Sequence, residues 1–214
     1  MNNLRECSEK ICEIGRRLYD RRMVSANDGN ISIRLSQTEI LCTPTGISKG
    51  LLTPQCLCIV DNEGSLLHAN GEFRPSSEMK MHLCVYQKRE DINAVVHAHP
   101  VFATAFAIQG IALEKPIMPE VIINFKKVPI AAYGTPSTQE IPDHLEPFLQ
   151  DYNAVLLESH GAITYADTLE MAMQRMESVE FYAELLYRTK MLGGSRVLSD
   201  DKIEKLYEIK HQSR

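Results

Sequence analysis

Three histidines have the type and spacing that a catalytic metal site needs. His97 and His99 stand one residue apart at the end of the apolar segment AVVHAH. On an extended strand, residues i and i+2 project to the same side, so both imidazoles can reach one ion. The pair alone fits one buried structural histidine and one exposed histidine equally well. His160 follows a second apolar segment, AVLLES, and a third histidine at a similar strand end favours a three-histidine zinc site with one open position.

Small polar residues and one carboxylate lie in turns that can complete such a site. Glu78 ends the segment PSSE, which is typical of a helix start. There, a glutamate is favoured by the helix dipole and a serine acts as a cap. Free N–H groups and hydroxyls at a helix start also bind phosphate. The turns DGN, at residues 28–30, and TPTG, at residues 43–46, add further donors, but each of these signals is weak alone.

Interleaved helices and strands must position these residues. The spacing of apolar residues predicts an opening helix, an antiparallel meander of strands, and then alternating strands and helices. The expected helices are residues 3–22, 79–89, 101–110, 137–150, 168–192 and a last one from about 199. The expected strands are residues 31–35, 39–43, 56–60, 65–69, 94–99, 127–133 and 154–160.

Composition limits the class of protein. The chain has 214 residues, of which 44% are hydrophobic and 24% charged, which favours one globular domain over residues 1–214. A net charge of −5 speaks against a nucleic-acid partner, and no apolar run is long enough to predict a membrane span. The charged N-terminal segment does not resemble a signal peptide. The phosphate-loop patterns GxGxxG and GxxxxGK[ST] are absent, so no nucleotide fold is expected.

The six cysteines indicate packing rather than disulfides or a zinc finger. They form no CxxC pair, and reduced thiols are typical of a cytoplasmic protein. Cys56 and Cys58 are two apart in CLCIV, so we expect both on the same face of a strand.

Five motifs in order along the chain resemble the class II aldolase/epimerase family. They are SANDGNIS, TPTGISKG, PSSEMKMH, AVVHAHP and ESHGAI. The resemblance covers nearly the whole chain and implies an α/β fold: a single αβα domain with a central, largely antiparallel sheet flanked by helices. It also implies a homotetramer with active sites at the subunit interfaces.

The motifs carry the family's site residues onto this chain. The resemblance implies zinc on His97, His99 and His160, with Glu78 as a fourth ligand when the site is empty and as the acid/base during turnover. It implies cleavage of a ketose 1-phosphate, such as L-fuculose 1-phosphate, reversibly into dihydroxyacetone phosphate and a small aldehyde. The implied phosphate-binding residues are Gly29, Asn30, Thr45, Gly46, Ser76 and Ser77.

Two positions separate members of the family. Glu78 favours an aldolase, because the epimerase that acts on L-ribulose 5-phosphate typically has an aspartate there. Glu120 falls where the fuculose-phosphate aldolases carry a proton-donating tyrosine, and it resembles the glutamate of methylthioribulose-1-phosphate dehydratases and some deoxypentose-phosphate aldolases. We therefore expect Glu120 to be the proton donor on the aldehyde side, unless it is merely a solvated charge.

Several alternatives stay open at this point. The same site suits a 5-deoxyribulose-1-phosphate aldolase or a methylthioribulose-1-phosphate dehydratase, and less readily the epimerase. A non-catalytic scaffold domain like that of the adducins is the alternative from another class. The adducin relatives lack the zinc histidines, so the presence of His97, His99 and His160 argues against it.

Overall fold

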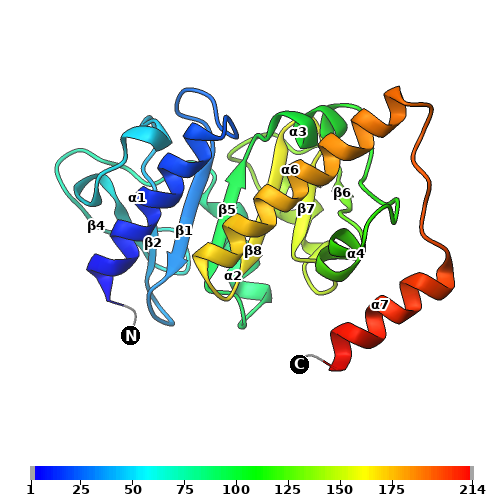
Figure 1. The fold of residues 1–214 in the computed structure, drawn as a ribbon. Helices are drawn as coiled ribbons and strands as arrows, with labels where there is room; N and C mark the ends of the chain where they lie inside the picture. The colour runs from blue at the N-terminus through cyan, green and yellow to red at the C-terminus, as the bar shows by residue number, and fades with distance from the viewer. Residues whose placement is uncertain (1–2, 213–214) are drawn as a thin grey trace.

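The chain folds around one open, eight-stranded sheet, which a computed structural model describes for residues 3–212 (Figure 1). The strand order is β4-β3-β2-β1-β5-β8-β7-β6, and every neighbouring pair is antiparallel except β6 and β7. The predicted α/β class with a largely antiparallel central sheet is confirmed. The strands are β1 (Asn30–Arg34), β2 (Ile40–Cys42), β3 (Cys58–Val60), β4 (Leu66–Ala69), β5 (Ala94–Ala98), β6 (Ile130–Ala131), β7 (Ala154–Leu157) and β8 (Gly161–Ala166).

Helices cover both faces of the sheet and complete the three layers. In Figure 1, α1 and α6 cross in front of the strands and α2 lies behind them. We call these two sides the α6 face and the α2 face. The helices are α1 (Leu4–Asp20), α2 (Met79–Lys88), α3 (Val101–Ile108), α4 (Pro119–Phe125), α5 (Glu140–Leu145), α6 (Leu169–Met191) and α7 (Asp200–Gln212), with short 3-10 turns η1 (Lys49–Leu51), η2 (Pro54–Cys56) and η3 (Glu146–Phe148).

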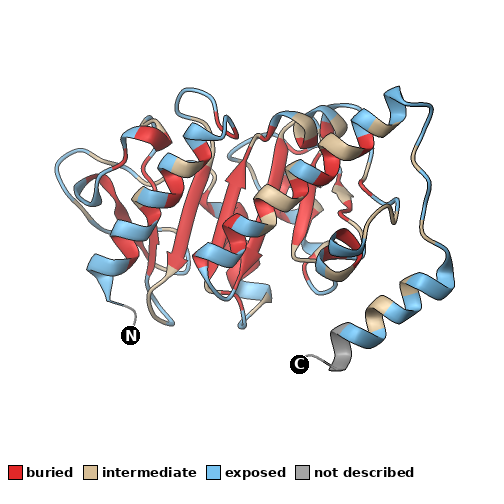
Figure 2. Ribbon diagram, viewed as in Figure 1, coloured by how far each residue is buried: buried red, intermediate tan, exposed pale blue. Residues whose placement is uncertain are grey.

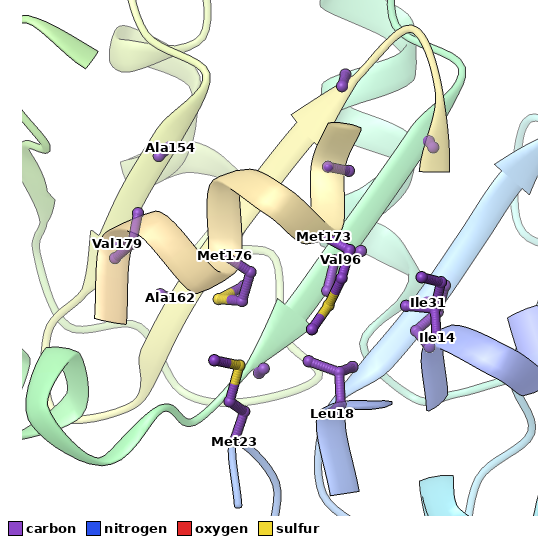
Figure 3. Packing of buried hydrophobic residues seen from close by; sticks show 14 of the residues in the cluster. Ile14, Leu18, Met23, Ile31, Val96, Ala154, Ala162, Met173, Met176 and Val179 are labelled. Atoms are coloured by element: carbon purple, nitrogen blue, oxygen red, sulfur yellow. The ribbon is translucent and has the colours of Figure 1, made fainter. Parts of the chain in front are cut away.

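The sheet separates two hydrophobic cores, and its strands are buried on both sides (Figure 2). Alternate residues of β5 serve the two cores, because successive side chains of a strand point to opposite faces. Val96 packs on the α6 face with Leu18 of α1 and Met173 of α6 (Figure 3), whereas Val95 packs on the α2 face. This alternation places His97, the neighbour of Val96, on the α2 face.

The ends of the longest helix follow the local sequence. Thr168 caps α6, since its side chain accepts a hydrogen bond from the Met171 N–H. The helix ends just before Gly193, whose φ of 98° a residue with a side chain rarely adopts. The prediction of a helix over 168–192 is confirmed. Within residues 3–212, no helix combines the length and apolar character needed to cross a membrane.

Several details differ from the prediction, and one is the short helix α4, which the sequence pattern did not predict. Cys56 and Cys58 do not share a strand face: Cys56 ends the turn η2 and packs on the α6 face, whereas Cys58 begins β3 and packs on the α2 face. Pro54, which cannot donate to a strand ladder, opens that turn and delays the strand. Glu78, rather than a serine, occupies the N-cap of α2, and β8 is a strand that the sequence pattern did not predict.

Candidate active site

Strand β5 and the turn between β7 and β8 bring the three predicted histidines together. His97 lies in β5 and pairs with Ile163 of β8, and His99 follows directly after the strand. His160 lies in the short turn that joins β7 to β8. One ring nitrogen from each of the three histidines lies within 4.8 Å of the others. The arrangement predicted from spacing alone therefore exists in the fold.

Close backbone approach in this turn depends on glycine. A Cβ added to Gly161 would lie 2.5 Å from the Ala98 oxygen and 2.7 Å from the His99 ring. Ser159, one residue before His160, adopts a φ of 57°, a conformation that costs energy for a residue other than glycine. The turn is thus held in a constrained shape that presents His160 to the other two rings.

In His97 and His99 the Nδ1 atoms face oxygen atoms, which leaves their Nε2 atoms for a metal. His97 Nδ1 lies 3.0 Å from the Ala162 carbonyl oxygen, which can only accept, so Nδ1 carries the proton. His99 Nδ1 lies 3.7 Å from an oxygen of Asp28. The Nε2 atoms of His97 and His99 lie 3.2 Å apart. Metal-binding histidines characteristically pair their second nitrogen with a carbonyl or a carboxylate in this way.

Burial favours the neutral form of His97 and His99. It lowers the pKa of His97 well below its ordinary value and also lowers the pKa of His99. A neutral imidazole offers the lone pair that a metal requires. The donor set therefore fits a divalent metal ion of the zinc type.

Glu78 lies beside the same nitrogens. Its Oε2 is 3.5 Å from His97 Nε2 and accepts a 2.8 Å hydrogen bond from Asn30 Nδ2, and its Oε1 is 3.2 Å from His160 Nε2. Burial alone would raise the pKa of Glu78, but these neighbours outweigh it and hold the pKa well below its usual range. Oε1 is buried and receives no well-aligned hydrogen bond within the described part of the chain, which suits a fourth metal ligand.

The turns predicted to bind phosphate lie side by side near this cluster. The Thr45 N–H donates to the Arg74 oxygen over 2.9 Å, and the Ser76 N–H donates to the Thr43 oxygen over 3.2 Å. Asn30 pairs with His97 across β1 and β5, so the third turn adjoins the histidines. The fold thus brings to one end of the sheet the turns that contain Gly29, Asn30, Thr45, Gly46, Ser76 and Ser77.

A buried lysine joins two of these turns. Lys49 is 1% exposed, and its Nζ donates to the Asn27 and Ile47 carbonyl oxygens, each over 2.9 Å. Burial lowers its pKa to about 8, with nearby Asp28 acting in the opposite direction. The sequence reasoning missed this role, because a lysine in a polar turn is ordinarily solvated.

Glu120 lies apart from the cluster within one chain. It is exposed in the first turn of α4, which Figure 1 draws beside α7 and well below α3. Within residues 3–212, the side-chain hydrogen bonds and ion pairs of the three histidines outside their own cluster go to Glu78, Asp28 and Ala162, and none goes to Glu120. The structure of one chain therefore does not place Glu120 among the residues that contact the histidines.

Comparisons with known proteins decide the family. The family model described as Class II Aldolase and Adducin N-terminal domain matches residues 9–187. The chain belongs to this family. It is 35% identical over 201 residues to a 5-deoxy-D-ribulose 1-phosphate aldolase of Bacillus thuringiensis serovar kurstaki, and the match covers 92% of each chain.

Further matches name another sugar phosphate. The chain is 35% identical to an L-fuculose phosphate aldolase of Methanococcus maripaludis, over 86% of this chain and 96% of the other. A solved L-fuculose 1-phosphate aldolase superposes with a TM-score of 0.87, at 29% identity and over 95% of each chain. With the three histidines assembled, the chain is a class II aldolase, a carbon–carbon lyase, and not a scaffold domain.

Sequence reasoning also missed His82. It is fully buried in α2 and accompanies Asn30 and Glu78, with its Nε2 2.5 Å from Asn30 Oδ1. The available signal was its spacing: His82 stands four residues after Glu78, so both lie on the same side of the helix.

Proposed function

We propose that the chain is a zinc-dependent aldolase that reversibly cleaves a ketose 1-phosphate into dihydroxyacetone phosphate and a small aldehyde. The observation that carries this proposal is the convergence of three histidines with Glu78, whose oxygens lie 3.2 Å and 3.5 Å from His160 and His97. Zinc is supported by the all-imidazole donor set, which leaves a position open for substrate.

The residues present can carry out both proton transfers. When bound, the metal would supply a Lewis acid for the ketose carbonyl oxygen. Cleavage breaks the C3–C4 bond, leaves its electron pair on C3 and needs a proton there. In condensation the Glu78 carboxylate removes this proton from C3. In cleavage the same group takes up a proton from solvent and returns it to C3, since its carboxylate adjoins the histidines.

The phosphate group is assigned to the turns at the same end of the sheet. Gly29, Gly46 and Ser77 offer N–H groups, and Thr45, Ser76 and Ser77 offer hydroxyls. Neutral donors of this kind bind phosphate without a dedicated cation. Asn30 belongs to the same turns, but its side chain already bonds to Glu78 and His82.

Glu120 is proposed to act from a neighbouring subunit. The C4 hydroxyl must lose a proton as the aldehyde departs, and a carboxylate is suited to accept it. The exposed position of Glu120 is consistent with a site at an interface of a homotetramer. Glu120→Gln should reduce cleavage while sparing proton exchange at C3 of dihydroxyacetone phosphate, which needs only the metal site and Glu78.

5-Deoxyribulose 1-phosphate is the second candidate substrate, favoured by the relative that matches 92% of both chains. L-Fuculose 1-phosphate is favoured by the relative and the solved structure that carry its name. We also propose that the enzyme works in the cytoplasm, where its free thiols would stay reduced.

The decisive experiment measures dihydroxyacetone phosphate release from both ketose 1-phosphates side by side. The zinc content of the purified protein, expected at about one ion per chain, is measured in parallel. Release from either substrate supports the proposal, and the faster substrate identifies the aldehyde half. Consumption of methylthioribulose 1-phosphate by loss of water, with no dihydroxyacetone phosphate from any substrate, would instead identify a dehydratase.

A further inference from the structure

A continuous line of buried side chains leads from the interior to Glu78. The Tyr86 hydroxyl lies 2.8 Å from Ser32 Oγ, and Ser32 Oγ lies 2.7 Å from His82 Nδ1. His82 Nε2 lies 2.5 Å from Asn30 Oδ1, and Asn30 Nδ2 donates to Glu78 Oε2 over 2.8 Å. We call these five residues the His82 relay. Asn30 and Ser32 belong to β1, His82 and Tyr86 belong to α2, and Glu78 is the N-cap residue of α2.

The chemistry of the Glu78 end sets the direction of every bond in the relay. An ionised carboxylate only accepts, so Asn30 must present its NH2 group to Glu78 and its carbonyl oxygen to His82. That oxygen also only accepts, so His82 must carry its proton on Nε2. Nδ1 of His82 then accepts from the Ser32 hydroxyl, which in turn accepts from Tyr86.

Burial prevents water from competing for the hydrogen bonds of the relay. Ser32 and His82 are 0% exposed, Asn30 is 2% exposed and Tyr86 is 3% exposed. Water therefore does not replace a lost partner, and an unpaired polar group at these positions is costly. Burial also lowers the pKa of His82 to about 4, which is consistent with a neutral ring. A set of bonds aligned in one direction polarises each member and strengthens the last donor.

We propose that His82 is a positioning residue of the aldolase: its Nε2–H holds the Asn30 amide with the NH2 group toward Glu78, and so fixes that carboxylate against the three histidines. This role rests on the function proposed above for Glu78. Without the His82 donor, the Asn30 amide can turn its oxygen to Glu78, which replaces an attraction with a repulsion.

The first test is kinetic and uses two substitutions of His82. His82→Phe keeps a ring but removes the donor, and we expect kcat to fall by about 10-fold to 100-fold with KM changed less than about 3-fold. His82→Gln retains an N–H at a similar distance along the side chain, and we expect it to recover most of the lost kcat.

Leu83→Ala is the matched control. Leu83 is also buried in α2, at 5% exposed, but takes no part in the relay. It should lose stability and keep kcat under conditions where the protein stays folded. An equal loss of kcat in Leu83→Ala, or a change in KM alone in His82→Phe, would overturn the positioning role.

The second test determines which ring nitrogen of His82 carries the proton, and it does not depend on activity. Long-range proton–nitrogen NMR of the zinc-loaded protein, with 15N-labelled histidine, should show His82 as the neutral Nε2–H form, assigned by its loss in His82→Gln. The Nδ1–H form or a charged ring at pH 7 in an active aldolase would overturn only the role of His82. If His82 shows the neutral Nε2–H form but the protein cleaves no ketose phosphate, the proposed function is overturned, and the positioning role of His82 is overturned with it.

Discussion

Both faces of the sheet are buried, but they bury different kinds of side chain. On the α6 face, Leu18, Met173 and Met176 pack against Val96 with no polar partner to satisfy (Figure 3). On the α2 face, apolar residues share the space with buried Asn30, Ser32, His82 and His97. Apolar packing tolerates a shape change at a moderate cost, whereas a buried polar network must be completely satisfied. We therefore expect substitutions on the α6 face to change stability and those on the α2 face to change catalysis.

The largest expected effect is that of His97→Ala on the α2 face. Removing one of three metal ligands should abolish both metal binding and aldolase activity, because two imidazoles hold zinc poorly. Circular dichroism should show the fold retained, and elemental analysis should show the metal lost. Full metal occupancy in the variant would contradict the ligand assignment.

Met176→Ala tests the α6 face. Met176 is 0% exposed, and its truncation should lower the free energy of unfolding by about 2–5 kcal/mol, because it leaves a cavity. Urea denaturation of the metal-loaded protein measures this loss. Turnover per folded molecule should stay at the wild-type value, and a marked fall in kcat would show that the two faces are coupled.

Glu78→Gln separates catalysis from stability on the α2 face itself. The amide keeps the shape of the side chain but removes the basic oxygen, so kcat should fall by about 100-fold. The three histidines should still retain the metal. Steady-state kinetics and metal analysis check both parts, and near-normal turnover would leave Glu78 as the N-cap residue of α2 alone.

Ser76→Ala should have a smaller effect, confined to substrate binding. The loss of one hydroxyl near the proposed phosphate position should raise KM for a ketose 1-phosphate by about 10-fold, since a hydrogen bond to a charged group contributes about 1.5 kcal/mol or more. Inhibition by an unphosphorylated analogue should not change. Ser65→Ala, in an exposed turn before β4, is the control. Equal effects on both ligands would exclude a phosphate contact.

The smallest expected effect is that of Lys49, a buried charged residue on the side of the molecule that α1 covers. Its backbone lies against Gly15 of α1. Its pKa is lowered to about 8 in the fold, from 10.5 in the unfolded chain, so the unfolded state binds more protons between these pH values. The contribution of Lys49 to the free energy of unfolding therefore rises with pH. From pH 7 to 9, wild type should gain about 1 kcal/mol relative to Lys49→Met. Parallel unfolding curves at both pH values check this, and a constant difference would contradict it.

Much of the site was predictable because its signals are local. The alternation of a strand puts His97 and His99 on one side, and the motif order identified Glu78 and His160 as their partners. Helix limits such as those of α6 also follow from a cap and two glycines. The strand alternation and the helix limits depend on a few neighbouring residues, and the resemblance to a family added the distant partners, so the sequence alone was enough to predict them.

Other features depend on which distant segments meet. The hydrogen bond between Ser32 and His82 exists only because β1 lies next to α2 in the fold. The ammonium of Lys49 is buried where the carbonyl oxygens of Asn27 and Ile47, from two separate turns, meet it. The different faces of Cys56 and Cys58 likewise depend on where β3 begins. Burial and hydrogen-bond direction are properties of the whole packed environment, because the cost of an unsatisfied polar group depends on every neighbour that excludes water. For these residues only the tertiary structure decided the role.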